Sequence, residues 1–234
     1  MKKKEIYGKN LKDQLIAASK DRLFRFILNS GQIRGVAIKC TKMIHEMRVN
    51  HELGILETLI LGHGYISAGL LSATLKGNDR FRIDLKCSGP AKGLSVESNA
   101  KGEVRGFLKA VPIPLNEPLR DFNMSPFIGA GFLEITKYLE DAKQPYTGQV
   151  MIEHGNLAQD LACYFNVSEQ TQTSFSLSIK FNSQGDVAGA GGLFLQVLPG
   201  ADDDTLVKIE KIIRSMPSIG DAFADLNQPE EAEK

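Results

Sequence analysis

The chain has 234 residues, enough for one large domain or two small ones. It is 42% hydrophobic and 24% charged, which suits a globular core rather than a disordered chain. Lysine plus arginine equal aspartate plus glutamate at 28 each, so charge gives no reason to expect nucleic acid or an anionic membrane as a partner.

The first predicted element is a strand within Asp21–Asn29, whose residues alternate in polarity. This alternation places Phe24, Phe26 and Leu28 on one face. For the longer segment that begins at Asp13, the pattern leaves strand and helix both open.

Two helices are predicted next. Val36–Asn50 has apolar residues near helical spacing, with lysine, glutamate and arginine on the other side. Leu53–Leu75 is apolar on every side of a helical wheel, and Glu57 is its one formal charge. Such a helix must be buried on all sides or lie in lipid. Glu57, His63 and several hydroxyl residues favour a soluble central helix covered by other layers, and we expect no membrane partner.

After this helix the apolar residues change from a helical period to a period of two, which is typical of half-buried strands. The predicted strands are Arg80–Cys87, Leu94–Ser98, Glu103–Leu108, Phe132–Thr136, Gln144–Ile152, Thr173–Phe181 and Val187–Leu198. A proline-rich irregular loop is predicted at Val111–Asn123, and an amphipathic helix at Asn156–Phe165 with Asn156 as its N-cap. Runs of short antiparallel strands predict an α+β fold rather than repeated βαβ units.

The end of the chain has a different composition. Pro199-Gly200 is the predicted boundary, and three aspartates and a threonine then suit the start of a helix. The apolar positions of the helical turns after this boundary are Leu206, Ile209, Ile213 and Phe223. The predicted divisions are a core domain over residues 1–199, a helical linker over 200–226 and a disordered acidic tail over 227–234.

Few residues suggest chemistry. The four histidines have no HxxxH or HExxH spacing, no serine lies in GxSxG, and no cysteine neighbours a histidine in a recognisable frame. His63 is expected to be a hydrogen-bonded core residue, with a buried proton carrier as the alternative. The glycines at 129–131 and 189–192 lack the full phosphate-loop patterns, so we expect them to permit close packing. Ser168-Glu169-Gln170 is expected to satisfy backbone groups at a helix end.

Several of these segments together resemble the redox-regulated bacterial chaperones of the heat-shock protein 33 family. The resemblance extends from Asp21 to Pro199, and the order and spacing of the matching segments carry it. These segments are DRLFRF with IRG, LLSATLK, CSGP, VRG, IGAGFLEIT, YF with SEQT, and AGG with LQVLP. The motif residues singled out are Gly89, Pro90, Arg105, Gly106, Gly129, Gly131, Tyr164, Ser168, Glu169, Gln170, Gly191, Gly192, Gln196 and Pro199.

The resemblance implies a cytoplasmic, ATP-independent holdase, which binds unfolding proteins and prevents their aggregation under oxidative or heat stress. It implies unfolded client proteins as partners, a homodimer as the active form and no catalytic site. It also implies a core in which a helix lies between β-layers, which agrees with the apolar helix described above.

The family normally continues into a small domain whose CxC and CxxC pairs bind one Zn²⁺ when reduced. Cys40, Cys87 and Cys163 form no such pair and match none of those ligands, which indicates unpaired thiols in a reducing cytoplasm. The resemblance therefore carries no zinc site to these residues, and we expect no metal or other cofactor. Two interpretations remain: a shortened piece of a longer chain, or a member that lacks the thiol switch.

We hypothesise that a linker without a zinc domain is held only by its own apolar side chains, so client-binding surface beneath it is partly available. The expected client-binding residues are Leu206, Ile209, Ile213 and Phe223. One alternative is an enzyme that uses Glu169, Arg105 or His63 in a pocket. Another is an interaction module without holdase activity, which a uniformly polar surface would favour.

Overall fold

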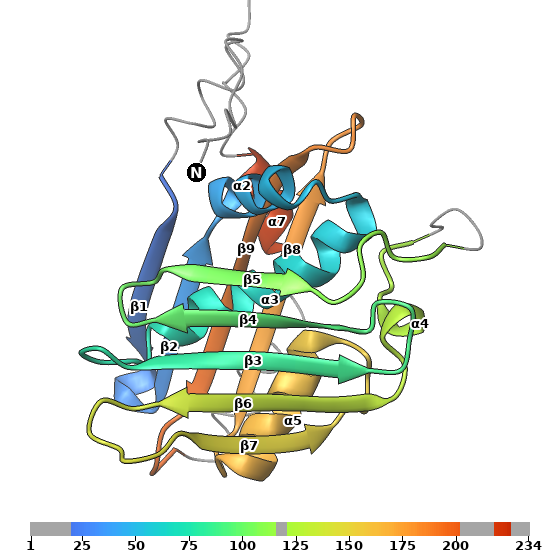
Figure 1. Ribbon diagram of the computed structural model, residues 1–234. Helices are drawn as coiled ribbons and strands as arrows, with labels where there is room; N and C mark the ends of the chain where they lie inside the picture. The colour runs from blue at the N-terminus through green and yellow to red at the C-terminus, as the bar shows by residue number, and fades with distance from the viewer. Residues whose placement is uncertain (1–19, 116–120, 202–217, 226–234) are drawn as a thin grey trace, which may run out of the picture.

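The computed structural model describes residues 20–115, 121–201 and 218–225, which form two antiparallel sheets with helices between and beside them (Figure 1). The four-stranded sheet has the order β1 (Arg22–Leu28), β2 (Ile33–Lys39), β9 (Val187–Val197) and β8 (Thr173–Phe181). The five-stranded sheet has the order β5 (Val104–Leu108), β4 (Gly93–Asn99), β3 (Arg80–Cys87), β6 (Gly131–Tyr138) and β7 (Tyr146–Met151). The helices are α2 (Thr41–His51), α3 (Ile55–Ser72), α4 (Ser125–Ile128), α5 (Leu157–Ser168) and α7 (Ile219–Asp225), with a 3-10 turn at Asn29–Gly31.

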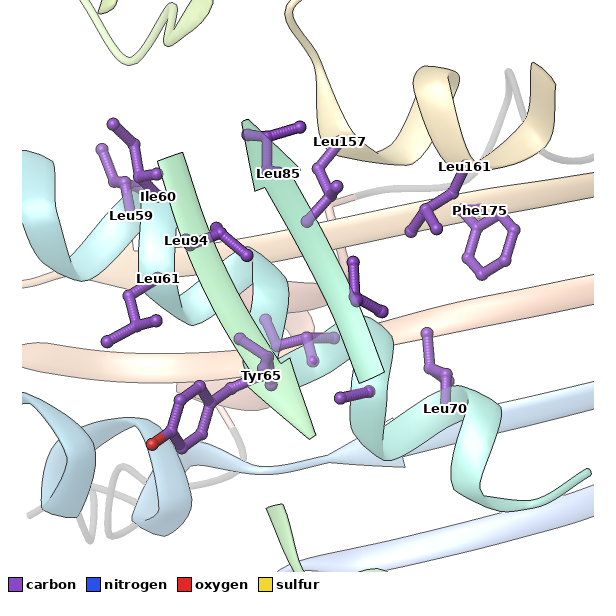
Figure 2. Packing of buried hydrophobic residues seen from close by; sticks show 14 of the residues in the cluster. Leu59, Ile60, Leu61, Tyr65, Leu70, Leu85, Leu94, Leu157, Leu161 and Phe175 are labelled. Atoms are coloured by element: carbon purple, nitrogen blue, oxygen red, sulfur yellow. The ribbon is translucent and has the colours of Figure 1, made fainter. Parts of the chain in front are cut away.

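Helix α3 lies between the two sheets, as its sequence predicts. It packs against β4 and β5 on one side and against β2, β8 and β9 on the other (Figure 1). Figure 2 shows Leu59, Leu61 and Tyr65 of α3 in the same cluster as Leu85 and Leu94 of the five-stranded sheet. The helix is long and apolar enough to cross a membrane, but 89% of that stretch is buried inside the fold. This burial satisfies an apolar helix without lipid, and the α+β prediction is confirmed.

Glycines allow α3 to approach the four-stranded sheet closely. A Cβ at Gly192 of β9 would lie 2.6 Å from Ile66 Cγ2, and a Cβ at Gly62 would collide with Ile179 of β8. A larger residue at either position would require the neighbouring isoleucine side chain to move. The small residues at the start of β9 therefore allow close packing, as the sequence predicts for the glycines at 189–192.

The helix predicted over Val36–Asn50 is wrong in its first part, because β2 continues to Lys39 and α2 begins only at Thr41. β2 is paired on both edges, with β1 and with β9, so its backbone groups are satisfied as a strand. The Asp21 carboxylate accepts hydrogen bonds from two backbone N–H groups of the first turn of α2, Lys42 at 3.1 Å and Met43 at 2.8 Å. Tertiary pairing thus sets this boundary rather than local apolar spacing.

The other predicted strands and helices within the described residues are present, with ends that differ by up to a few residues. The predicted helix over Leu206–Ile213, the disordered tail over 227–234 and part of the proline-rich loop lie outside the described residues. β3 and β8 have the predicted bounds, and β1 lies within Asp21–Asn29. The Asn156 side chain caps α5, since its Oδ1 accepts from Ala158 N at 3.1 Å. Both sheets are antiparallel throughout, which confirms the reading of the strand runs.

His63 of α3 does not have the hydrogen bond expected for its ring Nδ1. That atom is buried and has no partner within the described part of the chain. Desolvation lowers the pKa of His63 from 6.5 to about 4. A proton on this ring therefore favours the unfolded chain.

We expect protonation of His63 to destabilise the fold. The contribution of the neutral His63 ring to the free energy of unfolding is at most about 3 kcal/mol. It is fully present above about pH 6.5 and is lost as the pH falls from 6.5 to 4. His63→Gln should remove that part of the pH dependence in urea unfolding followed by circular dichroism. His51→Gln, at the exposed end of α2, should retain the wild-type slope. An unchanged slope in His63→Gln would contradict the assignment.

Candidate client-binding surface

The outer face of the four-stranded sheet is apolar across three strands. Ile33 of β2 and Leu193 and Leu195 of β9 form a buried cluster separate from the main core. We call the strand residues on this side the outer apolar face; it comprises Phe24, Phe26, Leu28, Ile33, Ala37, Leu193, Leu195 and Val197. It lies on the side of the sheet opposite α3, because alternate residues of β9 point to opposite faces.

Strand β1 extends the outer apolar face to an exposed edge. The Phe26 ring covers Gly35 of β2, where a Cβ would collide with it. Phe24 and Leu28 have the same strand face as Phe26 and are 51% and 44% exposed. Exposed aromatic and aliphatic groups beside a buried apolar cluster are typical of a surface that binds apolar partners.

Helix α7 lies on this face, against β9 and β8. The backbones of α7 and β9 approach closely because the residues at the contact are small. A Cβ at Gly189 would lie 2.6 Å from Ala224 N and would collide with Gly220 O. A Cβ at Gly220 would in turn lie 2.6 Å from Ser178 Oγ. Ile219 is the side chain of α7 that packs against the apolar cluster.

The polar contacts that the structure describes for α7 are exposed. Ser178 and Ser218 pair through their hydroxyl groups at 2.7 Å, and Lys180 Nζ lies 2.8 Å from Asp221 Oδ1. The hydrogen bond from Lys180 lowers the pKa of the Asp221 carboxyl. Exposed ion pairs of this kind add little stability. Among the described side chains of α7, the apolar contacts to the sheet come from Ile219 and the buried Ala224, and the glycine contacts bring the backbones close.

The predicted client-binding residues are only partly covered by the structure. Leu206, Ile209 and Ile213 lie outside the described residues. Phe223 belongs to α7, but its side chain lies outside them too. The apolar residues of β1, β2 and β9 on this side of the sheet were not among the client-binding residues expected from the sequence. The sequence pattern that could have indicated this apolar surface is the alternation that places Phe24, Phe26 and Leu28 on one face of the first strand.

The outer face of the five-stranded sheet is different, since charged residues from β3, β4, β5 and β6 cross it. Arg105 Nη2 lies 2.9 Å from Glu97 Oε1, and Arg80 Nη1 shares that carboxylate at 3.2 Å. Arg82 pairs with Asp84 at 2.7 Å. Apolar exposure there is concentrated at the sheet margins, on Phe107, Phe132 and Met151. Paired charges make its centre a poor surface for apolar clients.

The motif residues have structural contacts. Glu169 at the end of α5 accepts from Lys137 Nζ at 2.6 Å and from the Tyr164 hydroxyl at 3.2 Å, which ties the helix to β6. Desolvation, then Glu169, raises the pKa of Tyr164. Arg34 donates to the Gln196 side chain across β2 and β9.

The motif glycines mark close backbone approaches. Gly89 N donates to Ile128 O at 2.7 Å, and a Cβ at Gly106 would lie 2.5 Å from Ser95 O. Gly129 has φ of 67°, a conformation that favours glycine. The remaining motif positions lie in strands or at element ends: Gly131 in β6, Gly191 and Gly192 in β9, Pro90 between β3 and β4, Ser168 at the end of α5, Gln170 after it, and Pro199 after β9.

The structure does not bring the enzyme candidates together. Arg105 pairs with Glu97 on the exposed face of one sheet, Glu169 lies at the end of α5, and His63 lies in α3 between the sheets. Within the described residues it does bring together a thiol and an imidazole that no sequence motif connects. Cys163 Sγ lies 3.7 Å from His154 Nε2. Burial, then the charges of Glu153 and Asp160, raise the pKa of the Cys163 thiol.

The chain resembles proteins of one family over most of its length. Residues 21–233 match the family described as "Hsp33 protein". A "33 kDa chaperonin" of Desulforamulus reducens is 35% identical over 90% of this chain and 72% of its own length. One from Acetivibrio thermocellus is 34% identical with the same coverage. The crystal structure of the 33 kDa chaperonin of Thermotoga maritima superposes with a TM-score of 0.79 and 29% identity, over 90% of this chain and 71% of that one.

Gly189→Ala should loosen α7, because the new methyl group collides with the helix backbone. Overpacking of this size costs about 1–3 kcal/mol, so amides of α7 should exchange with deuterium roughly tenfold faster or more. Binding of a fluorescent apolar dye should rise as the outer apolar face opens. Ser95→Thr, which adds a methyl group to the outer face of the other sheet, is the control. Unaltered exchange in Gly189→Ala would refute this view of the contact.

Proposed function

We propose that this chain, which belongs to the Hsp33 protein family and acts as a chaperone, is an ATP-independent holdase. In this proposal it binds unfolding proteins under oxidative or heat stress and prevents their aggregation. The observation that carries the proposal is the outer apolar face with helix α7 packed against it. Unfolding proteins expose apolar segments, and an apolar sheet face can bury them.

We propose that helix α7 can be released, and the described side chains of α7 set the scale of the cost. Burial of Ile219 contributes about 1.5–3 kcal/mol at most. Ordering each residue of a helix costs about 1–2 kcal/mol of conformational entropy. A helix of seven residues is also shorter than isolated helices that persist in water. Release of α7 should therefore cost little and would enlarge the apolar surface offered to a client.

The family is a chaperone family rather than an enzyme family, so the enzyme alternative is set aside. We propose that client holding requires no metal or other cofactor, and that the protein acts in the cytoplasm as a homodimer. The equal numbers of acidic and basic residues support client binding through apolar contact rather than binding of nucleic acid or membrane. An interaction module without holdase activity remains the competing function.

Suppression of client aggregation should be constitutive and insensitive to redox conditions. In light scattering of a thermally aggregating client, the wild-type protein should suppress aggregation equally, within about twofold, after peroxide and after a thiol reductant. The reason is that no thiol pair among Cys40, Cys87 and Cys163 closes over the outer apolar face. A severalfold change between the two conditions would rule out this mode of action.

A designed disulfide tests whether the outer apolar face is the client site. Ser178→Cys with Ser218→Cys replaces hydroxyl groups that lie 2.7 Å apart, a separation close enough for a disulfide bond to tie α7 to β8. The oxidised double variant should suppress aggregation several times less than wild type, and reductant should restore it. Ser178→Cys alone is the thiol control. Full suppression by the tied variant would place the client site elsewhere, and no suppression by any variant would favour the interaction module.

A further inference from the structure

Three residues of different chemical type converge beside the start of α5. They are Glu153 and His154, in the connection after β7, and Cys163, two turns into the helix. One ligand atom from each lies within 4.8 Å of the other two. The Cys163 Sγ to His154 Nε2 distance is 3.7 Å. None of these residues belongs to the outer apolar face or to the motif residues.

The connection that carries His154 is fixed in place by a buried carboxylate. Asp160, which is 1% exposed, accepts hydrogen bonds from the backbone N–H groups of Glu153 and His154 at 3.0 Å and of Asn156 at 3.1 Å. Asp160 and Cys163 lie three residues apart on α5, so their side chains occupy neighbouring positions on the helix surface. The clamp on the connection therefore also sets the imidazole beside the thiol.

The distance between the thiol and the imidazole, which in the metal-free protein is that of a hydrogen bond, suits a tetrahedral metal ion. With bond lengths of about 2.3 Å to sulfur and about 2.0–2.1 Å to nitrogen, a tetrahedral Zn²⁺ separates its sulfur and nitrogen ligands by about 3.6 Å. The observed 3.7 Å needs almost no adjustment. Thiolate, imidazole and carboxylate are all zinc ligands, whereas Mg²⁺ and Ca²⁺ prefer oxygen alone. Glu153 and His154 are exposed, so an ion can enter from solvent.

We propose that Glu153, His154 and Cys163 bind one Zn²⁺, with a water molecule as the fourth ligand. The site uses none of the cysteine pairs by which the family's zinc domain is defined, and it does not depend on client binding. Its effect is to join the end of β7 to α5 through a metal ion.

The test is a titration of the whole chain, first freed of metal with a chelator, with Zn²⁺ in competition with a chromophoric zinc indicator. We expect one tightly bound ion per chain. Cys163→Ser and His154→Gln should each weaken binding by at least about tenfold, since each removes one of three protein ligands. Co²⁺ in place of Zn²⁺ should give a thiolate charge-transfer absorption band that Cys163→Ser abolishes.

Cys87→Ser is the matched control, because Cys87 is also a partly buried free thiol but lies in β3. It should bind Zn²⁺ like wild type. Zn²⁺ should also slow alkylation of Cys163 and leave alkylation of Cys87 unchanged. Unfolding curves recorded without metal establish that each variant folds. The site is refuted if wild type binds no stoichiometric Zn²⁺, if Cys163→Ser retains full affinity, or if Cys87→Ser loses as much.

Discussion

The structure depends on the need to bury α3 on every side. A helix without a polar face cannot lie on the surface of a water-soluble domain, and one sheet can cover only half of its circumference. Two sheets are therefore required, one on each side. Strands β1 and β2 before α3 join β8 and β9 from the end of the described core in one sheet, and β3 to β7, which follow α3, form the other. Gly62 and Gly192 let the four-stranded sheet come within van der Waals distance of the helix. The enclosed helix explains why the core residues come from nearly every element.

With the inner faces of both sheets committed to α3, the outer faces are left for function, and the two differ. On the five-stranded sheet, Arg105 and Glu97 belong to a set of paired charges that is satisfied in water. On the four-stranded sheet, Leu193 and Leu195 make an apolar surface that needs a cover. Helix α7 lies on the same side of this sheet, and among its described side chains Ile219 packs against these leucines. This asymmetry is the physical basis for proposing that clients bind to one sheet and not the other.

Sequence patterns were reliable where the structure follows from neighbours along the chain. The alternation in β3 and β8 predicted both strands with their bounds, and the shared face of Phe24, Phe26 and Leu28 is part of the outer apolar face. The pattern failed over residues 36–39, where apolar spacing suited a helix equally well. Pairing with two neighbouring strands decided the matter there, and that pairing is invisible in a local window.

The sequence by itself determined the α+β class, the buried central helix, most strand positions and the family resemblance, because each rests on short-range periodicity or on the order of motifs. Only the tertiary structure decided which side chains and backbones from different elements meet in space. It placed Gly189 against Gly220, Glu169 against Lys137, and Cys163 beside a histidine that no motif connects to it. These contacts depend on how strands and helices pack in three dimensions, and spacing along the chain carries no information about that packing.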